Sequence, residues 1–268
     1  MILKKYLPAS LILIMCALTL NAQNIKFLES NLVRINDSLY AHKYEVSNAE
    51  YKEFYSKNSS VELYPDTTGW EMVRDKVKPF TGSYYTNPQF DRYPVVCVNH
   101  KQAYDYCAWL TKTYNAYPVK KYKQVKFRLP SEEEWLMAAR GAEPEHTWFP
   151  WKGNSLRLND TKRMANYMVQ DDACIKSEML DNHLKFMCFD EALKLCFLEA
   201  VTTYPQTPFG VHNICGNAAE MTTDEAAPKG GSWLSSGYYL RLDIEKDEQL
   251  SIPSPMVGFR VFMDVVEQ

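Results

Sequence analysis

The chain has 268 residues, of which 46% are hydrophobic, and this composition suits one large globular domain or two small ones. The 30 lysines and arginines nearly balance the 33 aspartates and glutamates, so a formal net charge of −3 provides no broad field for nucleic acid or an anionic membrane. We therefore expect specificity to come from local sites.

Residues 1–22 have the three parts of an export signal. A short basic start precedes an apolar run over residues 11–20, and the small residue Ala22 stands before the expected cleavage point. A spanning helix needs roughly 20 apolar residues, more than this run supplies. We therefore expect a signal peptide over 1–22 and a mature domain over 23–268. No transmembrane segment would remain, and the location would be periplasmic, outer-membrane-associated or secreted.

The cysteines permit disulfides but do not indicate a zinc site. Cys16 lies in the signal, where lipid modification is an alternative, although Met15 occupies a position that normally carries a small residue in lipoprotein signals. The mature chain keeps an even number of cysteines, namely Cys97, Cys107, Cys174, Cys188, Cys196 and Cys215. None forms a CxxC pair or a Cys/His cluster with zinc-ligand spacing, so we expect either structural disulfides or buried free thiols.

Three segments predict helix starts through a polar N-cap that is followed three residues later by Glu or Gln, the capping box. The pairs are Ser47 with Glu50, Asn99 with Gln102, and Ser131 with Glu134. After Asn99 the apolar residues recur with helical spacing, so we expect Cys107 to be buried rather than reactive. The third helix is expected to end at Gly141, and the glutamates at 132–134 suit the positive end of its dipole.

Proline and glycine divide the rest of the chain into short strands and long loops, which predicts one α+β domain of irregular build. The segment 228–242, PKGGSWLSSGYYLRL, reads as a strand entered through a tight glycine turn, with Ser235 near its centre. The segment 171–200 is harder to assign, because it is strand-like from Leu184 to Cys188 and helical from Asp190 onward.

Seven motifs, in order, resemble those of the sulfatase-modifying factor family, which includes the formylglycine-generating enzyme. They are YEVSNAEYKEF (44–54), YPVVCVNHKQAYDYCAWL (93–110), FRLPSEEEWLMAARG (127–141), FPWKGN (149–154), FGVHNICGNAAEM (209–221), KGGSW (229–233) and VGFRVF (258–263). Together they cover nearly the whole mature chain. The resemblance implies an α+β fold that is C-type-lectin-like, with short strands and irregular loops, and that is often stabilised by calcium.

The activity that the resemblance implies is oxidation of a sulfatase cysteine to formylglycine by copper and oxygen. This chemistry needs two cysteines after the GGS motif, because soft thiolates hold Cu(I). Ser235 and Leu240 occupy those positions here. Ser236 and Gly237 replace the basic residues between them, and Ala219 stands where the family has tryptophan. We therefore expect no catalytic residue and no copper.

The resemblance also implies structural calcium. Residues that match the ligands of one family calcium site are Asn213, Gly216, Ala218 and Glu220. They would bind partly through backbone carbonyls, which suits a hard cation that takes oxygen ligands. Asn166 and Tyr167 match the start of a second site.

These observations predict an exported, non-catalytic domain that binds an envelope protein or a glycan, or serves as an envelope scaffold, and does not bind nucleic acid. Relatives in bacterial gliding and secretion machinery also lack the cysteines and serve as structural parts. The alternative is a formylglycine-generating oxidase, or a related oxidase, with an altered site. If the surface docks a protein, Trp70, Tyr84 and Tyr85 are candidate anchors, and core packing is the other interpretation of each.

Overall fold

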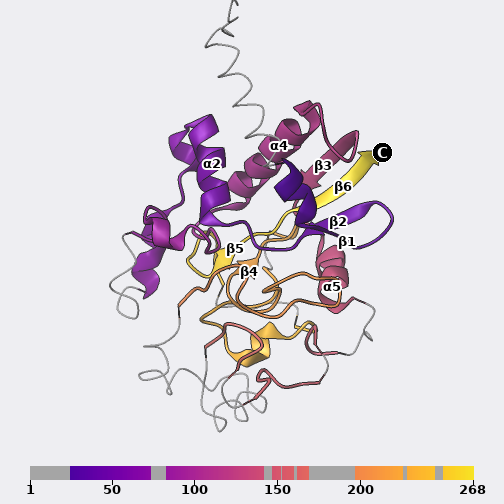
Figure 1. The fold of residues 1–268 in the computed structure, drawn as a ribbon. Helices are drawn as coiled ribbons and strands as arrows, with labels where there is room; N and C mark the ends of the chain where they lie inside the picture. Colours follow the sequence, from indigo (N-terminus) through magenta and orange to yellow (C-terminus); the bar gives the residue numbers. More distant parts are fainter. Residues whose placement is uncertain are drawn as a thin grey trace, which may run out of the picture.

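The computed structural model describes residues 25–73, 83–141, 147–151, 153–159, 162–168, 197–225, 228–244 and 250–268. Within these ranges, short helices and strands alternate with long irregular connections (Figure 1). The expected signal peptide, Cys16 and most of the segment 171–200 lie outside them, and so do Cys174, Cys188 and Cys196. In this described part, no helix is long and apolar enough to cross a membrane.

The α+β class predicted from the sequence is confirmed. The strands are β1 (Leu32–Arg34), β2 (Leu39–His42), β3 (Gln124–Arg128), β4 (Ala219–Glu220), β5 (Val257–Gly258) and β6 (Phe262–Glu267). The α-helices are α2 (Asn48–Asn58), α4 (His100–Ala116) and α5 (Glu132–Arg140). The 3₁₀ helices are η1 (Val61–Leu63), η2 (Thr67–Val73), η3 (Pro88–Phe90) and η5 (Gly237–Leu240).

The larger sheet joins both ends of the chain. Its strands are antiparallel in the order β1-β2-β6-β3, so the C-terminal strand lies between two strands from the first half of the sequence. Phe262 of β6 stands opposite Ala41 of β2 on one side and Arg128 of β3 on the other. The smaller sheet is a parallel pair of the two-residue strands β4 and β5. The domain therefore needs nearly its whole length before the sheets can close.

All three predicted capping boxes are present. Ser47, Asn99 and Ser131 each accept the amide of the residue three positions on, and the glutamate or glutamine there returns a bond to the cap. The third helix ends where expected, with Gly141 at its C-cap and a φ of +64°. A capping box depends on residues within one turn, which is why the sequence predicts it well.

The outer edge of β3 is closed by side chains of α4. Asn115 accepts the amide of Val125 at 3.0 Å and donates to the carbonyl oxygen of Val125 at 2.8 Å. Thr111 likewise accepts the amide of Phe127 at 2.8 Å and donates to its carbonyl oxygen at 3.4 Å. Free N–H and C=O groups on an edge strand invite pairing with another chain, and these two side chains occupy them.

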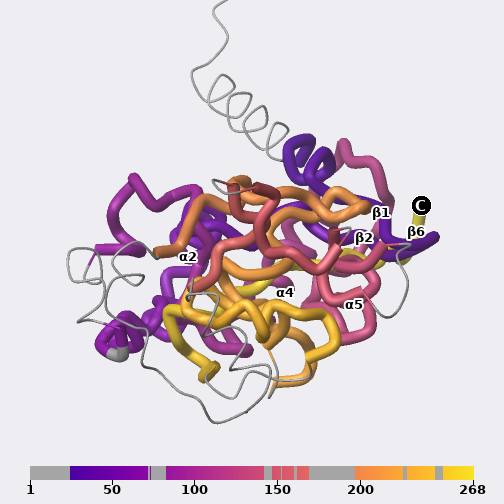
Figure 2. The backbone as a smooth tube through the Cα atoms, turned by 90° about the horizontal axis from the view of Figure 1, so that it is seen from below, coloured from indigo at the N-terminus to yellow at the C-terminus, as the bar shows by residue number. Residues whose placement is uncertain are grey.

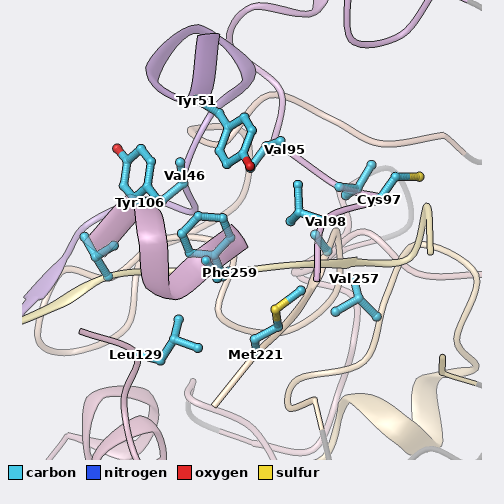
Figure 3. Packing of buried hydrophobic residues seen from close by; sticks show 14 of the residues in the cluster. Val46, Tyr51, Val95, Cys97, Val98, Tyr106, Leu129, Met221, Val257 and Phe259 are labelled. Atoms are coloured by element: carbon cyan, nitrogen blue, oxygen red, sulfur yellow. The ribbon is translucent and has the colours of Figure 1, made fainter. Parts of the chain in front are cut away.

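The main core lies among α2, α4 and the segments that lead into the two sheets (Figure 3). The ring of Tyr51 stacks on that of Tyr106 at a centroid distance of 6.0 Å, and Tyr106 meets Phe259 edge-on at 5.4 Å. The proposed docking anchors belong to this same core. Trp70, Tyr84 and Tyr85 are only 3%, 2% and 6% exposed, which contradicts a role as exposed anchors and confirms the core-packing interpretation.

The described cysteines are buried free thiols, the second of the two predicted states. Cys97, Cys107 and Cys215 are each at most 2% exposed and form no disulfide. Burial raises the pKa of all three thiols, that of Cys107 to about 12, because a thiolate loses its hydration there. The expectation that Cys107 is buried is thus confirmed, and none of the three is a reactive thiolate at neutral pH.

The segment 228–242 is not a strand, so that prediction is wrong, although its glycine turn is confirmed. Gly230 has a φ of +88°, and a Cβ there would lie 2.5 Å from the carbonyl oxygen of Ile214. The amide of Ser235 donates to the carbonyl oxygen of Ser232 at 3.0 Å, and the amide of Ser232 donates to Oγ of Ser235 at 2.9 Å. Serine side chains that bond to nearby backbone compete with strand pairing, and η5 follows the turn.

We predict that Asn115→Ala lowers the free energy of unfolding by about 1–2 kcal/mol, because both edge groups of Val125 lose their partner. Urea denaturation of the purified chain measures this difference. Lys112→Ala, an exposed change on the same helix, should stay within about 0.5 kcal/mol of wild type. Equal values for the two variants would show that Asn115 does not stabilise the edge.

Candidate functional site

A buried ion pair lies between the two sheets. Arg260, which is 0% exposed, donates from Nη2 to Oε1 of Glu220 at 2.5 Å and from Nε to both carboxylate oxygens at 3.1 Å. Its remaining donors reach the carbonyl oxygens of His42 at 3.0 Å and His212 at 2.7 Å. Trp135 of α5 donates to Oε2 of Glu220 at 2.9 Å. The guanidinium of Arg260 therefore bonds to three parts of the chain at once, namely β4, the end of β2 and the segment before β4.

A second buried carboxylate, Glu45, lies close to this pair. It stands between β2 and α2, is 0% exposed, and accepts Nδ2 of Asn217 at 2.8 Å and Nδ2 of Asn213 at 3.0 Å. Burial raises the pKa of the Glu45 carboxyl to about 8, the charge of Glu220 adds to the rise, and the charge of Arg260 opposes it. Two carboxylates thus share a dry region with one guanidinium.

The two carboxamides on Glu45 also hold the segment 197–204. Asn217 donates to the carbonyl oxygen of Glu199 at 3.2 Å and accepts its amide at 2.9 Å. Asn213 donates to the carbonyl oxygen of Ala200 at 3.2 Å. Any change in the charge of Glu45 therefore acts directly on the side chains that anchor this segment.

The structure brings part of the predicted calcium set together. Asn213 donates to Glu45, and the amide of Ala218 points at Oε1 of Glu45 at 3.4 Å. Gly216 lies beside Asn166, because a Cβ on Gly216 would be 2.2 Å from the carbonyl oxygen of Asn166. Glu220 faces Arg260 instead.

The predicted side chains alone do not fit a calcium ion as they are arranged. Oδ1 of Asn213 accepts the amide of Tyr204 at 3.1 Å, and both oxygens of Glu220 hold donors from Arg260 and Trp135. Glu45 adds a buried carboxylate to this set, and no cation pairs with it among the described residues. Carboxylate oxygens are the ligands that a hard divalent cation takes, and at present both oxygens of Glu45 accept N–H groups from Asn213, Asn217 and Ala218.

The start of the second predicted calcium site is connected to Glu45 through Asn217. Asn166 donates to the carbonyl oxygen of Phe197 at 2.8 Å and to Oδ1 of Asn217 at 3.1 Å. Tyr167 is 2% exposed, and its ring lies near Gly237. Much of the chain expected to complete this site lies outside the described residues.

Ser235 and Leu240 stand at the positions that the resemblance assigns to the family's cysteines. Ser235 lies in the turn from Ser232 to Ser235, which we call the serine turn, and Leu240 lies in η5. Ser235 is 2% exposed, its Oγ lies 3.0 Å from Oγ of Ser232, and its carbonyl oxygen accepts the amide of Met168 at 3.0 Å. Leu240 is 0% exposed. Ser235 is therefore a turn residue whose hydroxyl lies within hydrogen-bond distance of Ser232.

Three residues of this region were missed by the sequence analysis, namely Glu45, Asn217 and Arg260. Glu45 is the acidic residue of the motif YEVSNAEY, between Tyr44 and Val46, and an acidic residue between apolar neighbours is the signal that marks it. Arg260 is the cation of the motif VGFRVF in an apolar context. Charged residues are almost never fully buried unless paired, so a charge in such an apolar context predicts a buried polar partner.

Comparison with known proteins gives a match over most of the chain. The model of the sulfatase-modifying factor enzyme 1-like domain matches residues 21–265. Formylglycine-generating enzyme of Bos taurus is 26% identical over 214 residues, which cover 70% of this chain and 49% of that protein. Inactive C-alpha-formylglycine-generating enzyme 2 of Bos taurus is 27% identical over 181 residues, which cover 63% and 49%. The chain therefore spans about half the length of the curated relatives it matches.

Two solved structures share the fold. PvdO from Pseudomonas aeruginosa superposes with a TM-score of 0.52 at 18% identity, covering 84% of this chain and 80% of that one. CarF superposes with a TM-score of 0.52 at 14% identity, covering 85% and 86%. At these identities the similarity concerns the fold alone.

The pKa of Glu45 makes a prediction about stability. The folded carboxyl has a pKa of about 8, whereas an unfolded glutamate has a pKa of roughly 4.3. The stability that protonation contributes is complete below the lower value and is lost as the pH rises through about 8. Without added divalent cation, we expect Glu45→Gln to gain stability relative to wild type as the pH rises from about 5 to about 8, on the order of 1 kcal/mol or more.

Urea denaturation at several pH values with a chelator present measures this difference. Glu53→Gln, which neutralises an exposed carboxylate on α2, is the matched control and should keep a constant offset from wild type. A constant offset for Glu45→Gln as well would contradict the raised pKa.

Proposed function

Because the chain belongs to the sulfatase-modifying factor enzyme 1-like domain family, we propose that it is a non-catalytic member that acts as a binding or scaffold domain of the bacterial envelope. The observation that carries this proposal is the serine turn. Ser235 and Leu240 replace the two cysteines on which the family's copper chemistry would depend, and both side chains are buried.

The remaining described thiols support the same conclusion. Cys97, Cys107 and Cys215 are buried, and burial raises the pKa of each thiol, so none offers the thiolate that would hold Cu(I) or attack a disulfide. The relatives include both a formylglycine-generating enzyme and a protein whose name calls it inactive, so the family contains members of both kinds. A fold can be kept while the chemistry grafted on it is removed.

The export signal over 1–22 supports a location in the periplasm, at the outer membrane or outside the cell. The short strands and long connections support a C-type-lectin-like fold, which is a scaffold that can present loops to a protein or a glycan. We propose a partner from one of these two classes, and the alternative is a sulfatase cysteine as the substrate of an oxidase with an altered site.

The test is affinity capture of the tagged chain from its native envelope after mild crosslinking, with mass spectrometry of what is retained. We expect envelope proteins or glycan in fixed proportion to the chain. In parallel, a peptide with the sulfatase cysteine motif is incubated with the chain, copper and oxygen, and its mass should not change, whereas it should change with an active formylglycine-generating enzyme. Conversion of the peptide, or capture of a sulfatase, would overturn the proposal.

We also propose that the site around Glu45 takes a structural calcium ion. Glu45 would hold it together with backbone oxygens of Gly216 and Ala218, and Asn213 and Glu220 would join only by exchanging their present hydrogen bonds for the ion. The ion, when bound, supplies positive charge to two buried carboxylates that share one guanidinium. Asn213 and Asn217 then connect the occupied site to the segment 197–204.

This proposal predicts that calcium raises the melting temperature of the wild-type chain and that Glu45→Gln removes most of the rise. A ligand at a hundred times its dissociation constant stabilises the folded state by about 2.7 kcal/mol. Thermal melts with a chelator and with added Ca²⁺ measure the effect, and Glu53→Gln should respond as wild type does. The same shift in Glu45→Gln would place the ion elsewhere or show it to be non-specific.

A further inference from the structure

One stretch of the chain is strongly basic although the chain as a whole is slightly acidic. Between Tyr106 and Ser131 there are six lysines and arginines and no aspartate or glutamate, against a net charge of −3 for the whole protein. This stretch contains the end of α4, the connection 117–123 and β3. The balanced overall charge therefore conceals a local cationic surface.

The first described residues of the chain are attached to this connection. Glu29 accepts the hydroxyl of Tyr114 at 2.7 Å and the amide of Lys121 at 2.6 Å. Figure 2 shows residues 25–30 beside the connection between α4 and β3, and the C-terminal end of β6 lies at the same end of the molecule in Figure 1. We use the term lysine face for the surface formed by Lys26, Phe27, Val119, Lys120, Lys121 and Lys123.

The lysine face has more positively charged side chains than carboxylates near it. Lys26 and Lys121 form no ion pair with a carboxylate among the described residues, and both are exposed. Lys123 pairs with Glu267 at the end of β6. Lys120 donates to the carbonyl oxygens of Asn115 and Tyr117, at the C-terminal end of α4, and pairs with no carboxylate among the described residues. Four lysines thus stand against two carboxylates, Glu29 and Glu267.

The lysine face also carries apolar side chains that protrude. Phe27 is 62% exposed and Val119 is 70% exposed. Tyr122 packs under the ammonium of Lys121 at 4.9 Å and against the ring of Tyr40 at 5.4 Å. Lysines around exposed aromatic and aliphatic side chains are the composition of surfaces that lie in the interfacial layer of a bilayer.

Lipid modification of Cys16, the alternative to cleavage after Ala22, would bring the lysine face close to a bilayer. The apolar run over residues 11–20 ends only a few residues before Ile25, where the described fold begins. If lipid on Cys16 tethers the chain, Lys26 stays within about 35 Å of the bilayer. After cleavage at Ala22 the same lysines remain next to the new N-terminal amine, which adds another positive charge.

We propose that the lysine face lies against the anionic headgroups of a phospholipid bilayer, with Phe27 and Val119 entering the interfacial layer. This orientation would direct the Glu45 region and η5 away from the bilayer plane, toward partners in the surrounding space. A juxtamembrane lysine near an anionic surface contributes about 1 kcal/mol, which is about a fivefold change in partitioning. The interaction is therefore weak for each lysine and strongly dependent on salt.

The test is cosedimentation of the full chain with vesicles of phosphatidylcholine alone and of phosphatidylcholine mixed with phosphatidylglycerol. Because any apolar N-terminal segment contributes to both kinds of vesicle, the readout is the ratio of the two partition coefficients. We expect this ratio to fall by roughly a hundredfold in the triple variant K26Q/K121Q/K123Q. The control triple K57Q/K101Q/K162Q changes the net charge equally at exposed lysines elsewhere, and its ratio should stay close to that of wild type.

A second pair of variants separates the apolar contribution. Phe27→Ser should weaken binding to the mixed vesicles severalfold, whereas Val61→Ser, at a residue 88% exposed on η1, should not. Equal ratios for both lysine triples, or equal binding to both vesicle types, would overturn the proposal. Lysine-dependent binding to soluble polyglutamate without binding to vesicles would also overturn it and assign the face to an acidic protein.

Discussion

The buried pair of Arg260 and Glu220 is the interaction on which the rest of the structure depends. Removing one member of a buried ion pair typically costs about 3–5 kcal/mol, because the other charge is left without compensation. Here the guanidinium also satisfies the carbonyl oxygens of His42 and His212, and Glu220 also holds Trp135 of α5. One charge pair thus connects β2, α5 and β4 with the segment that leads into β6.

This arrangement leaves the neighbouring carboxyl of Glu45 without a cation of its own among the described residues. The single guanidinium is committed to Glu220, so Glu45 keeps its proton at neutral pH or requires another cation. Its amide partners, Asn213 and Asn217, pass any such change on to the segment 197–204. The motifs that contain Glu45, Asn213, Asn217, Glu220 and Arg260 thus meet in one buried group of charges and carboxamides.

The serine turn is held by its own side chains and backbone. Ser232 and Ser235 use their hydroxyls and amides on each other, so the segment where the family's thiolates would stand is filled by local hydrogen bonds. The lysine face lies at another part of the molecule, beside the end of β6. The surface that we propose for a bilayer is therefore separate from the region around Glu45 and the serine turn.

The sequence by itself determined the features that depend on neighbours within one turn. The capping boxes at Ser47, Asn99 and Ser131 and the end of a helix at Gly141 are of this kind, and so is the burial of Cys107 on the apolar side of α4. The ordered motifs likewise determined the family, because their sequence spans most of the domain.

Only the tertiary structure decided which charges meet and which aromatic rings are covered. Glu45 and Asn217 are 172 positions apart, and Arg260 reaches Glu220 across 40 positions, so no local pattern contains either contact. Trp70 is buried by residues brought in from distant segments such as Phe197 and Trp233. Burial and charge pairing are set by chain segments that meet only when the fold closes, and this is the physical reason why the sequence alone could not assign them.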